Sequence, residues 1–369
     1  MKDEKKKKVD WNSPETQAVI RRIYDDTFTR EGLMVAFPPC FPGVTLPIAA
    51  DESHITALDI TPDGIVYGGT SGRCSHLFFA AFHSTTGIVF DLGTVAGGER
   101  CAAVCAGTKS FFACVNGKRG GGRVVASELH RSDLDLIEEW GFRRKPFRDL
   151  GTVDGEPVIH AVSDANRKRM VGVTSRHLFT VDFESSRIDI AGEVPGAGRL
   201  GVGANGAVVG ADGAGHLWRY NPDSGLLQRR AVALPEGKWD PSLLLWSRSR
   251  QPGLLYTADS DGRIFSFDER LGFSAVLGRA PLAPVRTLAA SVDGRVYGFC
   301  GDEINRMFCY RPARKEVTDL GSAVSVIERR RYGFIFSDAA IGRDGEIYFG
   351  EDDNLGHLWL YFPKLEAGA

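Results

Sequence analysis

A three-residue phrase recurs seven times along this chain of 369 residues and constrains its fold more than any other feature. The phrase is a histidine or arginine followed by two apolar residues, and its copies begin at His76, Arg123, His177, His216, Arg263, Arg306 and His357. Successive copies lie 39 to 54 residues apart, which is the period of a four-stranded propeller blade. The repeat phrase therefore predicts an all-β, seven-bladed β-propeller.

Turn signals between the expected strands agree with this period. Asp-Gly or Asn-Gly pairs end at Gly64, Gly206, Gly294 and Gly345, and such pairs supply the positive φ that a tight hairpin needs. Counting strands from these turns, we expect blades to begin near His54, Arg100, Val158, Arg199, Ser242, Val285 and Phe334. The propeller would then occupy residues 33–363.

The two ends of the chain are expected to differ from the repeats. Residues 1–32 read as a polar tail and one helix, about 14–30, with Ser13 as its N-cap and Pro14 in its first turn, and residues 364–369 read as a short tail. The last blade has three strands of its own, so Leu33–Phe37 or Val44–Ile48 is expected to supply its fourth. Blade two carries an insertion, Leu129–Phe147, read as an exposed excursion.

Composition narrows the classes of function. A formal net charge of −2 gives no general attraction to nucleic acid or to membranes, so we expect neither as a partner. The seven cysteines lack zinc-site and thioredoxin spacing and fall mostly in apolar runs, which favours buried reduced thiols. Together with an N-terminus that lacks an apolar signal segment, this predicts a cytoplasmic protein, expected to be a monomer.

Conventional catalytic motifs are missing from the sequence. The glycines at Gly201, Gly203 and Gly206 match a dinucleotide fingerprint, but they lie in an expected hairpin with no helix after them. The histidines of the repeat phrase have two interpretations. Because they recur in equivalent positions, they fit a structural role in holding blades together better than a catalytic or metal-binding one.

Candidate site residues lie where the blades differ, at the loops that converge on the central channel. Basic residues at the expected starts of inner strands predict an anion-binding funnel, and proton transfer requires a histidine or tyrosine beside it. We therefore predict His54, His160 and Tyr332 as catalytic residues, and Arg73, Arg100, Arg199, Arg286, Arg331 and Trp239 as substrate-binding residues. The alternative is that each arginine pairs with an aspartate or glutamate of the next blade.

The stretches Asp344–Gly350 and Gly215–Gly225 resemble repeats of bacterial seven-bladed propellers, some of which belong to the carbohydrate-active group. That group includes polysaccharide lyases that act on uronate-containing glycans, so the resemblance implies an acidic carbohydrate as the ligand and a lyase as the activity. It covers about residues 54–363 at the level of single blades, and it transfers no catalytic residue.

Three functions stay open at this point. The first is a lyase or hydrolase acting on an acidic oligosaccharide or another small anion at the funnel. The second is a non-catalytic scaffold that binds a protein or a glycan, since propellers serve both purposes. The third is a metal-dependent lactonase or lyase that uses channel residues such as Asp338 and Asn354. The sequence specifies no cofactor and no particular metal ligand set.

Overall fold

The computed structural model describes residues 10, 12–14, 17, 31–40, 47–83, 86–118, 121–129, 146–195, 197–249, 253–326 and 331–364. The expected helix over 14–30 and the insertion 129–147 lie almost wholly outside these ranges. The helices described in full are two short 3-10 turns, η2 (Ala50–Glu52) and η3 (Pro241–Leu243). No helix within the described ranges has the length and apolarity needed to cross a membrane.

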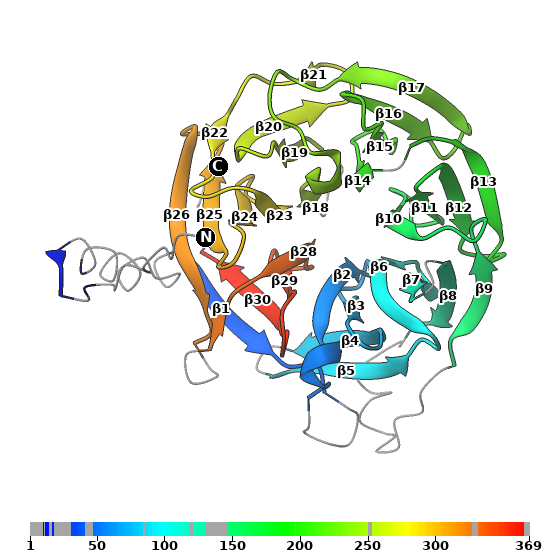
Figure 1. Ribbon diagram of the computed structural model, residues 1–369, viewed down its shortest axis with the longest axis horizontal. Helices are drawn as coiled ribbons and strands as arrows, with labels where there is room; N and C mark the ends of the chain where they lie inside the picture. Colours follow the sequence, from blue (N-terminus) through cyan, green and yellow to red (C-terminus); the bar gives the residue numbers. More distant parts are fainter. Residues whose placement is uncertain are drawn as a thin grey trace, which may run out of the picture.

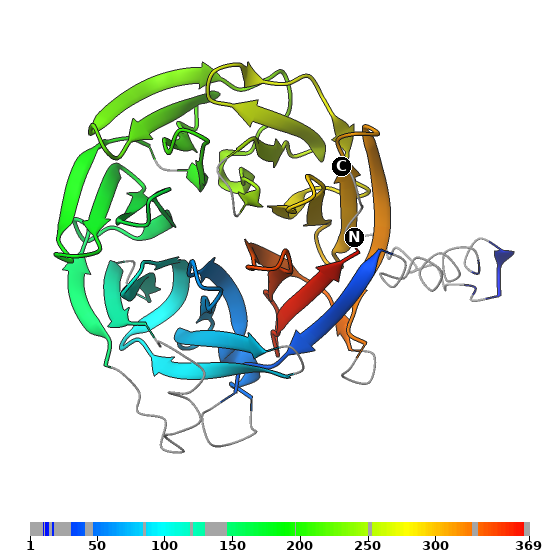
Figure 2. The same cartoon turned by 180° about the vertical axis from the view of Figure 1, so that it is seen from behind.

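Antiparallel strand pairing groups the described strands into propeller blades arranged in a ring, consistent with the seven that the period predicts (Figures 1 and 2). The strands of each blade are given from the channel outward. The first blade contains β2 (His54–Ile60), β3 (Val66–Ser71), β4 (His76–His83) and β5 (Thr86–Thr94), and the second contains β6 (Gly98–Ala106), β7 (Ser110–Gly117), β8 (Gly122–Glu128) and β9 (Arg148–Thr152). The third contains β10 (Val158–Ser163), β11 (Arg169–Thr174), β12 (His177–Asp182) and β13 (Ile188–Glu193), and the fourth contains β14 (Ala197–Val202), β15 (Val208–Ala211), β16 (His216–Asn221) and β17 (Leu226–Ala233).

The remaining blades are less regular. The fifth contains β19 (Leu255–Ala258) and β20 (Arg263–Asp268) with β21 (Gly272–Phe273) and β22 (Gly278–Arg279). It is preceded by β18 (Arg248–Ser249), which pairs in parallel with β23 of the sixth. The sixth contains β23 (Val285–Ala290), β24 (Val296–Cys300), β25 (Arg306–Arg311) and β26 (Glu316–Val324), and the last contains β28 (Phe336–Ile341), β29 (Ile347–Glu351) and β30 (Leu358–Pro363). A short strand, β27 (Tyr332–Gly333), pairs with β26 and leads into the last blade. The prediction of an all-β propeller is confirmed.

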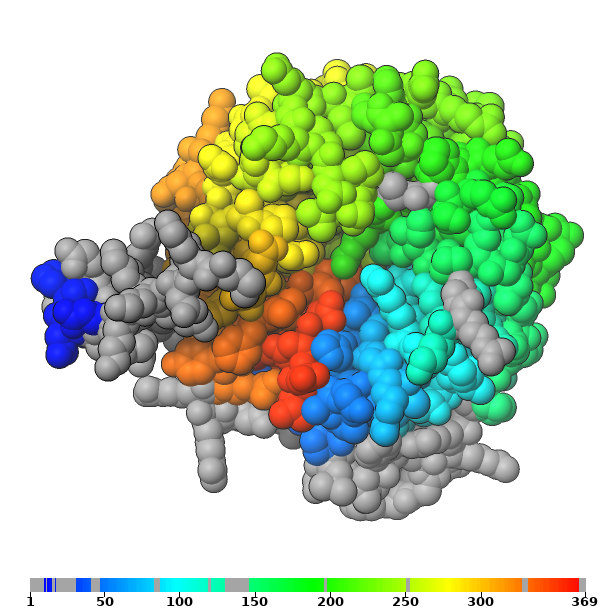
Figure 3. All heavy atoms as spheres, viewed as in Figure 1, coloured from blue at the N-terminus to red at the C-terminus, as the bar shows by residue number. Residues whose placement is uncertain are grey.

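The N-terminal strand closes the ring, as one of the two expected segments. β1 (Gly32–Phe37) pairs antiparallel with β30, with Gly32 opposite Pro363 and Phe37 opposite Leu358. The other expected segment, Val44–Ile48, lies mostly outside the described ranges. Figure 3 shows the last blade, in red, directly against the first, in blue. β1 thus supplies the outer strand of the last blade and covers the edge of β30.

The aromatic residues of the repeat phrase form the contacts inside the blades. Four of them lie opposite a glycine of the neighbouring strand, in the pairs Gly68–Phe78, Gly172–Phe179, Gly210–Trp218 and Gly298–Phe308. The other two, Phe265 and Trp359, lie opposite Thr257 and Phe349. A Cβ placed on any of these glycines would come within 2.2 to 2.9 Å of the facing ring. These positions therefore require glycine, because a side chain would collide with the facing ring, and the rings themselves are buried in the core.

The basic residue of the repeat phrase is paired with a carboxylate in every blade. The pairs, with their closest nitrogen–oxygen distances, are His76–Asp91 (3.0 Å), Arg123–Asp149 (3.2 Å), His177–Glu156 (3.3 Å), His216–Asp212 (3.8 Å), Arg263–Asp259 (2.6 Å), Arg306–Asp319 (2.9 Å) and His357–Glu351 (3.6 Å). The structural interpretation of the repeated histidines therefore fits. Backbone carbonyls contribute as well: His357 Nδ1 donates to the Leu355 carbonyl, and Arg123 and Arg263 donate to the carbonyls of Ala96 and Glu236 in the connections between blades.

Three of these carboxylates belong to an Asp-Leu-Gly sequence near the end of the fourth strand. Asp91, Asp149 and Asp319 each accept a hydrogen bond from the N–H of the glycine two residues later, at 2.8 to 2.9 Å. Those glycines have φ between +87° and +112°, a conformation that favours glycine. The motif thus turns one carboxylate toward the basic residue of the phrase.

Replacing Asp319 by asparagine tests how much such a pair contributes. The asparagine oxygen still accepts the Gly321 N–H, so the change mainly removes the charge that faces Arg306. The two side chains are 15% and 21% exposed, and we expect a loss of about 1–3 kcal/mol in the free energy of unfolding. Asp149→Asn is the matched control: its pair with Arg123 is 42% and 52% exposed, and we expect less than about 1 kcal/mol. Equal losses, measured by denaturant titration, would contradict this ranking.

Candidate functional site

Irregular pairing near the start of the inner strands places polar side chains in the channel. The register shifts fall at 55–57, 101–103, 158–160, 197–201, 285–287 and 336–339. A β-bulge leaves residues unpaired and redirects their side chains. Arg199, Arg286 and Asp338 lie within these irregular segments. The positions that the sequence marked as channel residues are therefore set by local breaks in the sheets.

Two guanidinium groups share one buried carboxylate in the channel. Arg199 Nη1 lies 3.1 Å from Asp338 Oδ1, and Arg248 Nη2 lies 3.5 Å from Asp338 Oδ2. The Leu58 N–H also donates to Oδ2, at 2.8 Å. Burial alone would raise the pKa of Asp338, but Arg248 and Arg199 outweigh it and hold that pKa below its ordinary value. Asp338 is thus ionised and fully occupied by these partners.

His160 lies beside this group as a neutral imidazole. The Leu200 N–H donates to its Nδ1 at 3.1 Å, which places the ring proton on Nε2. Burial, reinforced by Arg248 and Arg199, holds the pKa of His160 well below its ordinary value. The residue is 6% exposed. Its contacts are those of a structural histidine.

His54 lies at the end of the channel where the inner strands begin, which we call the upper mouth; Arg100 and Arg199 also lie near the starts of their strands there. His54 Nδ1 lies 3.3 Å from Asp352 Oδ1, and Nε2 lies 3.2 Å from Asn354 Oδ1. Both ring nitrogens thus face oxygen atoms, an arrangement that favours the imidazolium. The Asp352 carboxylate raises the pKa of His54 above its ordinary value.

Arg100 and Arg199 belong to the same electrostatic environment. Burial lowers the pKa of Arg199; Asp338 and Asp352 act to raise it, and Arg248 and Arg100 act to lower it. Arg100 is exposed and forms no ion pair with any described residue. The upper mouth therefore combines one unpaired guanidinium, one guanidinium that shares its carboxylate, and an imidazole held by Asp352. Arg100, Arg199 and His54 are the predicted site residues that this geometry relates to one another.

The other predicted arginines are engaged in local pairs. Arg286 binds Asp302 at 2.6 Å, Arg331 binds Glu351 at 3.2 Å, and Arg73 binds Glu52 at 2.5 Å. These arginines are paired with carboxylates, as in the alternative, but each partner belongs to the arginine's own blade or to the connection that leads into it, whereas a partner in the next blade was expected.

Trp239 and Tyr332 also lie apart from His54 in their contacts. The Trp239 indole N–H donates to the Pro235 carbonyl at 2.8 Å, and its ring packs against Phe265 and Phe273. The ring is thus used in packing. Tyr332 is 42% exposed, and its hydroxyl has no hydrogen-bond partner among the described residues.

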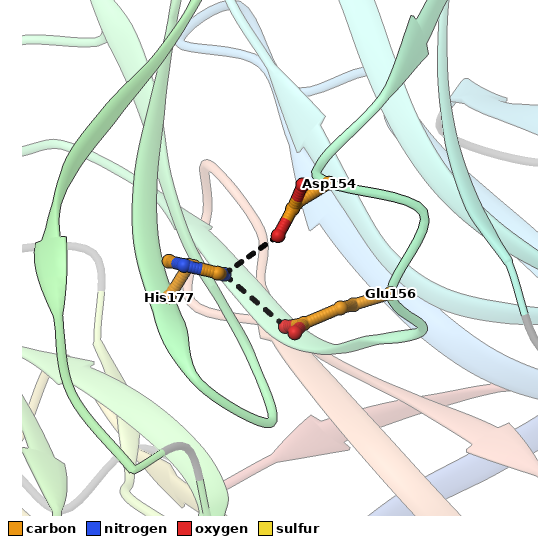
Figure 4. A group of neighbouring side chains, drawn as sticks. All are labelled: Asp154, Glu156 and His177. Atoms are coloured by element: carbon orange, nitrogen blue, oxygen red, sulfur yellow. Dashed lines mark hydrogen bonds and ion pairs between the residues drawn. The ribbon is translucent and has the colours of Figure 1, made fainter.

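A group with metal-ligand chemistry lies on blade three, outside the channel set (Figure 4). Asp154, Glu156 and His177 bring ligand atoms within 4.8 Å of one another, the one such group within the described ranges. Arg176 donates into it, binding Glu156 and lying 3.7 Å from Asp154. The Thr174 hydroxyl, with Arg176 and His177, lowers the pKa of Glu156 to about 2. The positive charge is thus supplied by arginine, and the channel candidate Asp338 belongs to no such group of histidine, cysteine and acidic residues within the described ranges.

Glu351, next to Asp352, is a fully buried carboxyl group. Its Oε2 accepts hydrogen bonds from the Trp359 indole at 3.0 Å, the His357 N–H at 3.0 Å and Arg331 at 3.2 Å. Its Oε1 and the Asp353 Oδ1 have no hydrogen-bond partner among the described residues. Burial raises the pKa of Glu351 to about 7. This carboxyl group therefore takes up or releases a proton near neutral pH.

We expect Glu351 to make the protein less stable as the pH rises. Its native pKa lies above the unfolded value of 4.5, so the native state holds the extra proton, and this stabilisation is lost between about pH 4.5 and 7. Glu351→Gln should flatten this part of the curve of unfolding free energy against pH. The exposed Glu316→Gln removes one charge without touching the cluster and serves as the control. An unchanged slope in Glu351→Gln would contradict the assignment.

Sequence reasoning missed two residues of the channel, Arg248 and Asp352. Arg248 was missed because blade five lacks the Asp-Gly hairpin that marks an inner strand in other blades. Asp352 was not among the predicted site residues. Its position could have revealed it, because the loop before the third strand of the last blade must lie next to the first strand of blade one when the ring closes.

Comparison with known proteins supports the fold. No protein-family model and no curated protein matches the sequence. A streptogramin B lyase structure aligns with a TM-score of 0.60 at 10% identity, over 91% of this chain and 99% of that chain. A catalytically inactive histidine-to-alanine variant of virginiamycin B lyase from Staphylococcus aureus, with quinupristin, aligns with a TM-score of 0.59 at 8% identity, over 90% and 99%.

The selenomethionine-substituted virginiamycin B lyase from Staphylococcus aureus aligns with a TM-score of 0.56 at 8% identity, over 84% of this chain and 94% of that chain. At these identities the likeness shows a shared fold. The neighbours are named as lyases of streptogramin B and virginiamycin B, and none of these three is named as a polysaccharide lyase. The expected resemblance to the carbohydrate-active group therefore gains no support beyond the propeller fold.

Proposed function

We propose that this protein is a lyase that binds a carboxylate-bearing substrate at the upper mouth and uses His54 to transfer the proton. The observation that carries the proposal is the pairing of His54 with Asp352 and Asn354 beside Arg100 and Arg199. The sequence predicted His54, Arg100 and Arg199 independently of the fold comparison. That the compared propellers are named lyases adds support to this class of reaction.

Arg100 and Arg199 would hold the substrate carboxylate. Arg100 is exposed and has no ion-pair partner among the described residues, while Arg199 is 29% exposed and shares Asp338 with Arg248. A guanidinium binds a carboxylate through two parallel hydrogen bonds, which fixes its orientation. Positive charge beside the carboxylate also stabilises the negative charge that develops when the neighbouring carbon loses its proton.

His54 would act as base and then as acid. The neutral imidazole takes the proton from the carbon next to the carboxylate, and the electron pair of that C–H bond forms a C=C bond as the bond to the leaving oxygen breaks. The imidazolium then returns the proton to this oxygen, so no atom is gained or lost overall. Asp352 and Asn354 stabilise the imidazolium that forms in the first step.

Acidic oligosaccharides are the first substrates to test. In a uronate, the carbon next to the carboxylate carries a hydrogen, and the adjacent ring carbon carries the glycosidic oxygen that can leave. The purified protein is incubated with pectic, ulvan-like and glucuronan-type substrates, and ultraviolet absorbance reports the unsaturated product. We expect a signal with at least one substrate that is unchanged by a chelator and lost in Arg100→Gln. The exposed Arg187→Gln on blade three is the matched control. No change in ultraviolet absorbance with any of these substrates would refute a uronate lyase.

The pairing of Arg73, Arg286 and Arg331 with acidic residues favours a second candidate, a non-catalytic scaffold. A scaffold would bind an acidic glycan or a protein without turning it over. Calorimetric binding of an oligosaccharide that stays intact after long incubation would support this function over the lyase.

A further inference from the structure

A cavity of about 400 Å³ lies at the opposite end of the channel, which we call the lower mouth. Its lining comes from the ends of the inner strands β2, β10, β14 and β28 and from the β18 segment, whereas His54 and Arg100 lie at strand starts. Leu200, Val202, Trp246 and Ile341 form apolar parts of its wall. The cavity is therefore separate from the site at the upper mouth.

Arg248 contributes a guanidinium group to the wall of this cavity. Its Nη2 makes two long contacts of 3.5 Å, one to the Leu58 carbonyl and one to Asp338. Its Nε and Nη1 form no hydrogen bond with the described residues, and its side chain is 25% exposed. Asp338 has a closer guanidinium partner in Arg199, at 3.1 Å. Arg248 thus retains unused donors in a fork that fits an oxyanion.

The acidic residues of the cavity wall are already occupied. Asp59 Oδ2 accepts hydrogen bonds from the Ala106 N–H at 2.8 Å, the Ser163 hydroxyl at 2.8 Å and Arg167 at 3.1 Å. Asp164 Oδ1 accepts the N–H groups of Lys168 and Arg169. Arg167 and Arg248 are the two guanidiniums of the wall, and Arg167 is bound to Asp59 at 3.1 Å. Arg248 is thus the guanidinium of the wall that no carboxylate of the wall binds.

We propose that the lower mouth binds a small oxyanion, a carboxylate or a phosphate, through Arg248. The anion would take the Nε and Nη1 donors of Arg248, while the apolar wall excludes water and strengthens the contact. This site does not depend on the proposed lyase activity. It also lies on the far side of Asp338, so ligands at the two mouths occupy different guanidiniums.

The test titrates the full-length protein with inorganic phosphate and with acetate, followed by calorimetry and by tryptophan fluorescence, since Trp246 lines the cavity. We expect one saturable site, at least about tenfold weaker in Arg248→Gln and partly retained in Arg248→Lys. Arg187→Gln should leave it unchanged. Thermal unfolding of each variant checks that it has folded, and phosphate should raise the melting temperature of the wild type more than that of Arg248→Gln.

Two further variants locate the anion. Leu254→Trp changes an exposed side chain at the cavity rim and is expected to block binding without loss of the fold. Arg100→Gln alters only the upper mouth and is expected to leave binding intact. Binding that survives Arg248→Gln but disappears in Arg100→Gln would overturn the proposal, and so would the absence of any saturable binding to the wild type.

Discussion

Replacing Asp338 by asparagine is expected to lower the free energy of unfolding by about 3–5 kcal/mol. The substitution keeps the shape of the side chain but removes the charge that Arg199 and Arg248 share. Asp338 is 4% exposed, and the two guanidiniums are 29% and 25% exposed, so water compensates little of the loss. Two buried like charges would then face each other across the channel. Denaturant titration at neutral pH measures the loss.

The matched control for this prediction is Asp302→Asn. Asp302 binds Arg286 at 2.6 Å, a shorter contact than either at Asp338, but Asp302 is 71% exposed. We expect a loss below about 1 kcal/mol despite the better distance. Adding Arg248→Gln to Asp338→Asn should recover part of the stability, because it removes one of the two unpaired cations. A loss at Asp338 no larger than that at Asp302 would contradict the buried-charge account.

Replacing His54 by glutamine is expected to lower kcat/KM by about 10²- to 10⁴-fold on whichever acidic substrate the protein turns over. Glutamine keeps hydrogen bonding at this position but cannot accept the proton. His54 is partly exposed, so the variant should fold, and circular dichroism checks this. Wild-type activity in His54→Gln would exclude His54 as the acid–base residue.

The pH profile adds a readout that a merely structural role would not change. The neutral form of His54 is the base, so kcat/KM should rise with pH through the pKa of His54, which Asp352 raises above its ordinary value. Asp352→Asn removes this effect and should move the rising limb to lower pH while reducing the maximal rate. A limb that stays in place would show that Asp352 does not act through His54.

The fold was predictable because its determinants are repeated and local. The phrase at His76 and its six copies set the period, and the glycine–aromatic pairs and Asp-Leu-Gly turns act within single blades. Ring closure by Leu33–Phe37 was predictable for the same reason, since a blade with three strands needs a fourth. These features require no knowledge of distant contacts.

The candidate site was predictable only in part, because its contacts join residues far apart in the chain. Arg199 and Asp338 are separated by 139 positions, and His54 and Asp352 by 298. Their meeting depends on the ring closing and on bulges that the residue pattern does not mark. His160 shows the converse: its position in an inner strand was anticipated, but its burial beside two arginines, which keeps it neutral, was not.

Mass spectrometry of the reaction products tests the central claim most directly. After incubation of an acidic oligosaccharide with the protein, elimination at the upper mouth predicts two fragments whose masses add up to the mass of the substrate, with one fragment carrying a new double bond. His54→Gln and Arg100→Gln should yield neither fragment, and Arg187→Gln should yield both. Fragments heavier by one water in total would show hydrolysis, and an intact substrate across the panel would show binding without catalysis; either result would contradict a lyase.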